Sequence, residues 1–302
     1  MSVGVKTKQV AGRNWRAFLR RFLRWLTTPQ VFLSLILIAV MFYMVVIPLY
    51  RMLMTTITVQ DIDLQSIKGA TVGEFTLYHW IRMLTGKIAK IMTYEPLLHS
   101  LTISLGATGL ALLIGGLMAW IVVRTDIPGS NTIHFFATIP YIMPSWTIAM
   151  AWTVVFKNHT TGGTMGLIEY VSGMPTPDWL AYGAVPIIIS CALHYYTFFF
   201  LFCSAAFLSI DSSLEEAGEL AGASRWRVMR KITFPLVIPA IMSGFIMTFS
   251  KTMGTFGGPN VLGVPVKYYT LSTMLRSNTG MGNYGDGFVL AIILILFAMT
   301  TV

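Results

Sequence analysis

The sequence predicts an all-α membrane protein with about six transmembrane helices, and three features of its 302 residues lead to that fold class. Hydrophobic residues make up 55% of the chain and charged residues 11%, and the mean hydropathy is +0.70, which does not fit a soluble globular domain. Several apolar runs reach or approach about 20 residues, the length that a helix needs to cross the hydrocarbon core. The bases cluster beside these runs, so the net charge of +9 indicates a topology signal and no nucleic-acid partner.

The first two predicted regions are a basic segment and a single span. Residues 1–30 carry seven bases and no acid, which is typical of a cytoplasmic amphipathic helix lying on an anionic membrane surface. The apolar run at 31–50 is the first predicted transmembrane helix, and a polar segment follows it. We therefore expect residues 31–95 to form the first transmembrane helix and an extracytoplasmic loop.

Residues 96–302 are predicted to form a membrane core of five further spans. The fifth of these runs has only about 16 residues and no polar flank, so we expect the chain to be cut inside or near the end of that span. Pro140 and Pro144 lie four residues apart in one run, where they are expected to kink or break the helix and free backbone carbonyls. The predicted spans are 100–123, 133–156, 181–208, Pro235 to about 256, and 287–302.

The distribution of bases predicts the orientation of the chain. If the N-terminus is cytoplasmic, the inner side carries seven bases in residues 1–30, one between the second and third spans, and four in residues 211–235. These twelve outnumber the eight bases on the outer side, and five of those eight lie in or at the start of the longest loop, which counts less. The sequence therefore predicts a cytoplasmic N-terminus and a cytoplasmic 211–235 segment.

The segment 211–235, DSSLEEAGELAGASRWRVMRKITFP, reads as two short helices joined by a sharp turn. A capping box formed by Ser213 and Glu216, or by Ser212 and Glu215 one residue earlier, can begin the first helix. Gly222 suits the left-handed position that ends a helix. A second helix follows from Ser224, and the chain then re-enters the membrane.

A plain connecting loop with positive-inside bases would also account for part of this segment. Two features favour a docking role. Leu214, Ala217, Gly218 and Ala221 repeat at helical spacing and form a small apolar face, which is costly in water unless another protein covers it. The segment is also long for a connector that only reverses the chain.

This segment resembles the EAA motif of the membrane permease subunits of binding-protein-dependent ABC importers. The family pattern is Glu-Ala-Ala, three residues, Gly, nine residues, Ile-x-Leu-Pro. The chain departs from the pattern at Gly218, where the family has Ala, and at Phe234, where the family has Leu. The matching residues are Glu216, Ala217, Gly222, Ile232 and Pro235.

The resemblance, which extends over about residues 95–302, implies a type I ABC importer permease-like core whose helix pair couples to a separate cytoplasmic ATPase dimer. The expected coupling residues are Glu215, Glu216, Ala217, Gly218, Gly222, Ile232 and Pro235. No G-x-x-x-x-G-K-[ST] motif is present in the chain, so ATP and Mg²⁺ are expected in the partner ATPase. We expect no cofactor or metal bound by this chain, and we find no catalytic constellation in it.

The resemblance also implies the remaining partners and the place in the cell. These partners are a second permease half or homologous subunit and an extracytoplasmic substrate-binding protein. The expected location is the cytoplasmic (inner) membrane of a bacterium or archaeon. Because many members most like this chain are fused proteins with two cores, this chain is expected to be one such half.

Four residues are candidates for the translocation path. Lys251 is the one base well inside a predicted span, although it can also snorkel to the outer interface. His194 lies in a polar and aromatic patch, where a structural hydrogen-bonded role is the alternative. Pro140 and Pro144 shape the expected kink, and direct contact with substrate is the lesser alternative.

The substrate expected from the resemblance is iron(III), or a related solute such as thiamine, phosphonate or polyamine. The segment TFGGPNVLGVPVKYYTLSTML carries most of this resemblance, together with RTDIPG and PYIMP. Two other function classes stay open. One is a secondary transporter driven by an ion gradient, which would need carboxylates inside the spans; the other is a membrane scaffold that recruits a cytosolic partner without transporting anything.

Overall fold

The computed structural model describes Trp15 and residues 28–300, and within these residues it contains helices and no β-strand. Most of the predicted basic segment 1–30, and the last two residues of the predicted final span, lie outside the described residues. The chain divides into two compact units, residues 1–55 and 56–302, which are treated separately below. The predicted boundaries after residues 30 and 95 stay predictions.

The first unit contributes one long helix, α2 (Pro29–Thr56), which contains the predicted span 31–50. At about 1.5 Å per residue its 28 residues exceed the thickness of the hydrocarbon core. Its large side chains are mostly exposed, as expected of a surface that meets lipid or another apolar surface.

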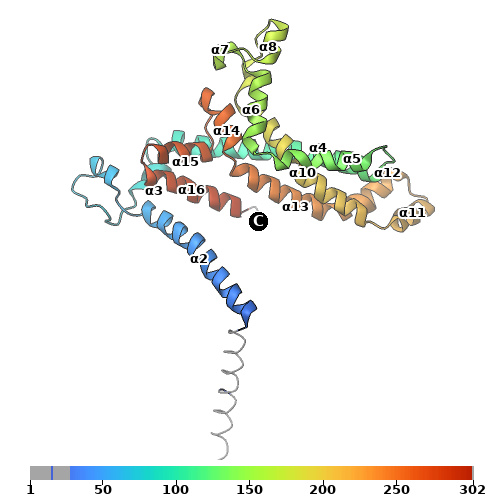
Figure 1. The fold of residues 1–302 in the computed structure, drawn as a ribbon, viewed down its shortest axis with the longest axis horizontal. Coiled ribbons are helices and arrows are strands. Elements are labelled where there is room, and N and C mark those ends of the chain that lie inside the picture. Colours follow the sequence, from blue (N-terminus) through green and yellow to red (C-terminus); the bar gives the residue numbers. More distant parts are fainter. Residues whose placement is uncertain (1–14, 16–27, 301–302) are drawn as a thin grey trace, which may run out of the picture. The chain divides into compact units, whose positions relative to one another are not determined.

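The second unit begins with short elements and is built around three long helices (Figure 1). Helix α10 lies at the centre, against α4 on one side and α13 on another, and its aromatic side chains Phe199 and Phe200 are fully buried. The bounds are η1 (Asp61–Gln65), α3 (Tyr78–Leu84), the π-helical turn η2 (Lys90–Tyr94), α4 (Glu95–Arg124), α10 (Ala184–Ser209) and α13 (Phe234–Met253).

Two glycines let these long helices approach closely. A Cβ atom on Gly115 of α4 would lie 2.3 Å from the carbonyl oxygen of Tyr196, and one on Gly244 of α13 would lie 2.6 Å from the Phe199 ring. Small residues at helix contacts let the backbones of membrane helices approach closely, and Gly115 and Gly244 both have this role.

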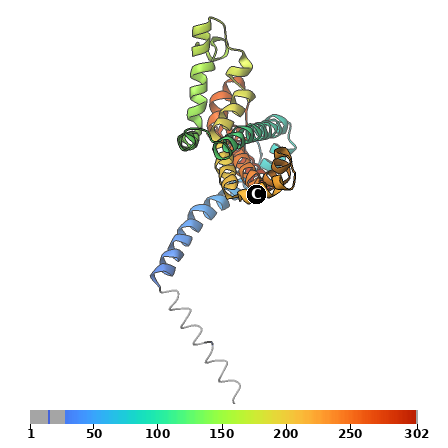
Figure 2. The same cartoon turned by 90° about the vertical axis from the view of Figure 1, so that its right-hand side faces the viewer.

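The predicted span 133–156 is two helices, α5 (Ser130–Ile142) and α6 (Ser145–Phe156), bent by 95° at a short break. Pro140 lies inside α5 and Pro144 is the residue that precedes α6, so the expected break at the two prolines is confirmed. Figures 1 and 2 show α6 standing across the direction of α4, α10 and α13. It leads into three short helices, α7 (His159–Gly162), α8 (Leu167–Ser172) and α9 (Asp178–Ala181).

The last part of the chain returns along the second unit. Residue Gly257 begins α14 (Gly257–Leu262), followed by η4 (Val264–Val266), α15 (Leu271–Gly280) and α16 (Tyr284–Met299). Within residues 28–300, four helices are long and apolar enough to cross a membrane, and the bent pair α5–α6 can be a fifth. The predicted sixth span corresponds to the shorter apolar helix α16.

Candidate functional site: the 211–235 helix pair

The segment 211–235 folds as the predicted pair of helices with a turn. Helix α11 (Ser212–Leu220) is followed by α12 (Arg225–Val228), and the π-helical turn η3 (Met229–Thr233) leads directly into α13. Gly222 has a φ angle of +83°, a left-handed conformation that glycine adopts without steric cost. The N–H groups of Gly222 and Ala223 bond back to carbonyls of α11, so the predicted glycine end of the first helix is confirmed.

The start of α11 differs from the predicted capping box. The Asp211 side chain accepts a hydrogen bond of 2.9 Å from the N–H of Ser213, so Asp211, and neither serine, caps the helix. The same hydrogen bond holds the pKa of the Asp211 carboxyl below its ordinary value. An aspartate competes as well as a serine for this position, so the sequence pattern left the boundary one or two residues uncertain.

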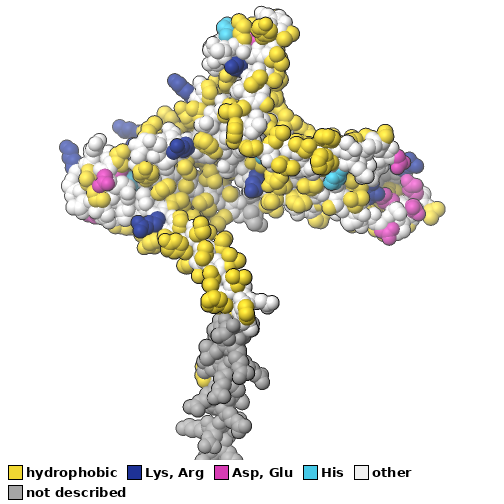
Figure 3. All heavy atoms as spheres, viewed as in Figure 1, with side chains coloured by type: hydrophobic (Ala, Val, Ile, Leu, Met, Phe, Trp, Pro, Cys, Tyr) yellow, Lys and Arg dark blue, Asp and Glu magenta, His cyan; other side chains and the backbone are white. Residues whose placement is uncertain are grey.

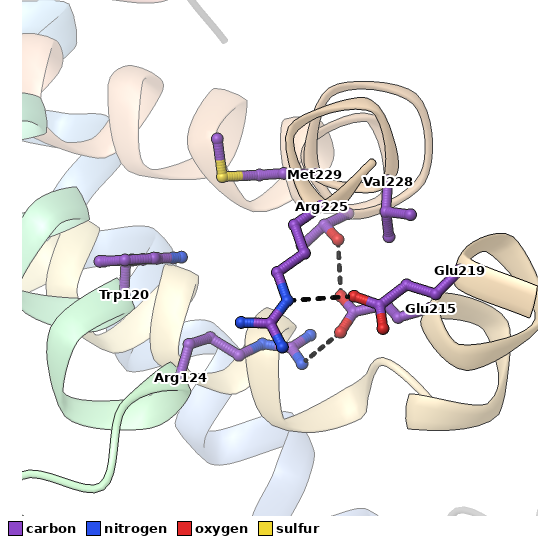
Figure 4. Close-up of a pocket in the computed structure, with 8 residues that line it drawn as sticks. Trp120, Arg124, Glu215, Glu219, Arg225, Val228 and Met229 are labelled. Atoms are coloured by element: carbon purple, nitrogen blue, oxygen red, sulfur yellow. Dashed lines mark hydrogen bonds and ion pairs between the residues drawn. The ribbon is translucent and has the colours of Figure 1, made fainter. Parts of the chain in front are cut away.

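Glu215 faces into the protein and joins α11 to two transmembrane helices (Figure 4). One carboxylate oxygen lies 3.1 Å from Nη1 of Arg124, the last residue of α4. The other oxygen accepts a 2.6 Å hydrogen bond from the hydroxyl of Thr233, directly before α13. The Arg124 guanidinium also lies 5.7 Å from the centre of the Phe207 ring, in the last turn of α10.

This junction borders a pocket of about 370 Å³ that Trp120, Glu219 and Arg225 also line. The Glu219 carboxylate lies 3.5 Å from Nε of Arg225, whose side chain is 93% exposed. Of the two ion pairs, the Arg124 pair is the more sheltered, and it is therefore less screened by water and salt. Neither Arg124 nor Thr233 was among the predicted coupling residues, because nothing in their local sequence marks them as partners of Glu215.

The predicted coupling residues divide into an inner and an outer set. Gly218 packs inward, where an added Cβ would lie 3.0 Å from Cδ1 of Ile232 and 3.1 Å from Cγ2 of Val228. The departure from the EAA pattern at this position therefore coincides with a tight contact. The residues exposed on the outer surface are Glu216, Ala217, Gly222 and Pro235. Figure 3 shows acids and bases gathered at this end of the second unit.

Three of the four predicted path residues come together at the break between α5 and α6. Pro144 has no N–H to donate to the carbonyl of Pro140 four residues earlier, and the imidazole of His194 on α10 lies near that carbonyl, with its ring centre 6.0 Å from the ring centre of Tyr141. One turn further along α10, the Thr197 hydroxyl donates to the carbonyl of Ala137 at 3.1 Å. Lys251 takes no part in these contacts and is exposed in the last turn of α13.

The sequence reasoning missed a buried ionic cluster. His79 of α3 lies 3.1 Å from Asp63 of η1 and 3.1 Å from Asp286 of α16, and Arg82 lies 3.1 Å from the second oxygen of Asp286. Asp286 stands just before the last predicted span, and this position was the one available signal. Among the described residues, no group of three or more His, Cys, Asp and Glu side chains is placed to hold a metal ion.

Burial by itself lowers the pKa of His79. The hydrogen bond to Asp286 and the charges of Asp63 and Asp286 outweigh this effect, so the pKa of His79 is raised above its ordinary value. A Cβ on Gly285 would lie 2.3 Å from the imidazole, so glycine at this position leaves room for the ring.

Comparisons with a protein family, with individual relatives and with solved structures all match this chain to membrane transport proteins. The family described as "Binding-protein-dependent transport system inner membrane component" matches residues 111–302. A molybdate/tungstate transport system permease protein of Thermococcus kodakarensis is 24% identical over 68% of this chain and 73% of its own length. A putative 2-aminoethylphosphonate transport system permease protein of Salmonella typhimurium is 26% identical over 84% of each chain.

A solved structure shares the fold. A chain from a bacterial ABC transporter involved in the import of the acidic polysaccharide alginate superposes with a TM-score of 0.66 at 15% identity. The match covers 96% of this chain and 95% of that chain. At this identity, the likeness supports the fold of a type I importer permease and nothing further.

Proposed function

The chain belongs to the family of inner membrane components of binding-protein-dependent transport systems, the permease subunits of ABC importers, and on that premise we propose that residues 211–235 couple it to a separate ATPase. One observation carries the proposal. The helix pair exposes Glu216 and Ala217 on its outer surface, while Glu215 ties its inner surface to α4 and α13. A surface that contacts a moving partner and is fastened to transmembrane helices is suited to transmit movement.

The partner would supply the energy. This sequence contains no P-loop motif, so ATP and Mg²⁺ would bind in a cytoplasmic ABC ATPase dimer. The surplus of bases supports an orientation in which the N-terminus and residues 211–235 lie on the cytoplasmic side, where the helix pair would contact that dimer. A second permease half or homologous subunit, and an extracytoplasmic substrate-binding protein, would complete the assembly.

The contacts of Glu215 suggest how a movement of the helix pair would pass to the transmembrane helices. When the ATPase dimer closes, a displacement of α11 would carry Glu215 with it. Because Glu215 holds Arg124 and Thr233, the ends of α4 and α13 would move together with the helix pair. The Arg124 guanidinium against Phe207 would extend the displacement to α10. These helices form the packed centre of the second unit. Their movement would therefore switch the permease between an inward-facing and an outward-facing state.

We place the translocation path along the break between α5 and α6. His194 there lies near a carbonyl that Pro144 leaves without its helical donor, and polar backbone at membrane depth is tolerated where protein or a water-filled cavity surrounds it. Pro144, directly before α6, lies at the break, and Pro140 lies inside α5, two residues before the end of that helix. Lys251 stays a prediction for the path.

We propose a small anion with a tetrahedral oxygen-bearing centre as the substrate class. The names of the two relatives above include molybdate, tungstate and an aminophosphonate, and phosphonate was already among the solutes expected from the sequence. The alternative substrates are iron(III), which the sequence motifs favoured, thiamine and polyamine.

Uptake by proteoliposomes tests both parts of the proposal. The chain, its ATPase and its binding protein are reconstituted with ATP inside, and uptake of labelled molybdate, 2-aminoethylphosphonate and iron(III) is measured. Glu216→Lys and Gly222→Asp should abolish uptake while the protein stays in the membrane. Uptake that continues at the normal rate in both variants would refute the coupling role.

The same assay separates the other function classes. Uptake that persists without ATP and collapses with the proton gradient would indicate a secondary transporter. Assembly with the ATPase, without any substrate that stimulates ATP hydrolysis, would indicate a scaffold.

A further inference from the structure

A second pocket lies beside the one shown in Figure 4, with which it shares Trp120, Met229 and Thr233, and its exposed lining is apolar. It holds about 330 Å³ between the ends of α4 and α10, the short helix α12 with η3, and the start of α13. Thr233 also borders the pocket, but its hydroxyl donates a hydrogen bond to Glu215. The apolar lining residues are Trp120, Phe207, Trp226, Met229 and Phe234.

The pocket lies at the depth where a membrane meets water. Trp120 is four residues from the end of α4 and Phe207 is two residues from the end of α10. At 1.5 Å per residue these side chains lie within about 6 Å of the helix ends. Both helices are candidate spans, and tryptophan is enriched at membrane interfaces. A lipid chain can therefore reach this pocket, whereas a water-soluble apolar ligand has no preferred route to it.

One base, Arg230, lines the pocket, and Arg227 and Lys231 lie close to it in the sequence. All three are exposed, and none of them has an acidic partner among the described residues. Arg225, in the adjoining helix α12, differs because it pairs with Glu219. Each unpaired base near a membrane surface strengthens binding of anionic lipid by about fivefold.

From the apolar lining, the depth and these unpaired bases together, we propose that this pocket binds an anionic phospholipid. One acyl chain lies among Trp120, Phe207 and Phe234, and the phosphate group lies at Arg230, with Arg227 and Lys231 adding long-range attraction. A zwitterionic lipid would leave these bases without a net counter-charge. A soluble anion would leave the apolar walls empty, and an apolar side chain from a protein partner would satisfy only the walls.

Bound lipid would also fasten the helix pair to the membrane. Trp226 belongs to α12, whereas Trp120 and Phe207 belong to transmembrane helices, so a chain between them links the loop to the spans by a second, apolar contact. The fraction of anionic lipid in the membrane would thereby change the strength of the link between the helix pair and the transmembrane helices.

Fluorescence quenching by brominated lipid tests the proposal on the assembled transporter. The complex is placed in nanodiscs of phosphatidylcholine with increasing phosphatidylglycerol, with bromine on the acyl chains of one lipid at a time. Because the chain has eight tryptophans, the Trp226 signal is taken as the difference between the wild-type protein and Trp226→Phe. We expect saturable quenching at a low fraction of brominated phosphatidylglycerol and little quenching by brominated phosphatidylcholine.

Substitutions separate the headgroup from the chain. Arg230→Gln should weaken the apparent affinity for phosphatidylglycerol about fivefold. Arg225→Gln is the matched control, because Arg225 is an exposed base of the adjoining helix α12 that already has an acidic partner, and it should leave the affinity unchanged. Met229→Phe should reduce quenching by filling the pocket while the bases remain.

Three results would overturn the proposal. Equal quenching by both brominated lipids would show general membrane contact. Full competition by millimolar glycerol phosphate would show that the site recognises the phosphate alone. Quenching that appears only after the ATPase is removed would show that the partner protein occupies the pocket in the assembled transporter.

Discussion

Nδ1 of His79 lies 3.1 Å from a carboxylate oxygen of Asp286, although 207 residues separate the two in the chain. Both side chains are 2% exposed. Asp286 lies in the first turn of α16 and His79 in α3, so the contact fastens the last helix to the segment between α2 and α4. With Asp63 and Arg82, the cluster has two acids and two bases, and its charges balance when His79 is protonated.

The raised pKa of His79 predicts that stability falls as the pH rises. A group whose folded-state pKa lies above its unfolded value stabilises the protein fully below the unfolded value, here about 6.5, and that contribution is lost as the pH rises through the folded-state pKa. We expect the thermal unfolding midpoint of the purified chain to decline between about pH 6.5 and the folded-state pKa. His79→Gln should remove this part of the decline, and an unchanged pH profile in the variant would contradict the assignment.

Loss of Asp286 should be more damaging than loss of a surface charge. Asp286→Asn leaves His79 and Arg82 without their shared counter-charge in a buried place, and breaking such a pair by removing one partner costs about 3 kcal/mol. The free energy of unfolding, measured with denaturant in detergent micelles, checks this. Glu219→Gln, which removes one partner of an exposed pair, is the control and should cost less than about 1 kcal/mol.

A charge exchange between Arg124 and Glu215 tests the junction of α4 and α11. Each single reversal, Arg124→Glu or Glu215→Arg, places like charges about 3 Å apart and should reduce uptake at least tenfold. The double variant should recover part of the uptake and of the substrate-dependent ATP hydrolysis. Equal loss in the single and double variants, with normal binding of the ATPase, would show that the pair has no part in coupling. Arg225→Glu is the control, because it reverses a charge in the exposed pair with Glu219, and it should reduce uptake less than either single reversal.

Two glycines of α4 offer a matched pair for the packing of the long helices. Gly115→Ala places a methyl group against the Tyr196 carbonyl, and overpacking of this kind costs about 1–3 kcal/mol. Gly109→Ala, on the same helix, has no atom within 4 Å of the new Cβ, so it should be neutral or stabilise the helix by up to about 1 kcal/mol. Thermal unfolding of the two variants checks the difference, and equal midpoints would contradict the close approach of α4 and α10.

Local sequence was a good guide to the helices and to their interruptions. The long apolar runs, the turn at Gly222 and the break near Pro140 and Pro144 were all predicted, because each depends on neighbours within a few residues: helix length, a left-handed φ angle, or a missing N–H. Where two residue types could serve the same local role, as Asp211 and Ser213 could at the start of α11, the boundary was predicted wrongly. The EAA motif is likewise a local spacing, and it pointed to the family that the comparison then showed.

The sequence by itself therefore determined the class of protein, most of its spans and the two-helix form of the 211–235 segment. The tertiary structure decided which side chains meet. It turned Glu215 inward to Arg124 and Thr233, left Glu216 outside, and buried His79 between Asp63 and Asp286. The longest of these contacts, between His79 and Asp286, joins residues that are 207 positions apart. The physical reason is that an ion pair depends on the distance between two atoms after folding, and no periodicity along the chain records which distant helix ends will come together.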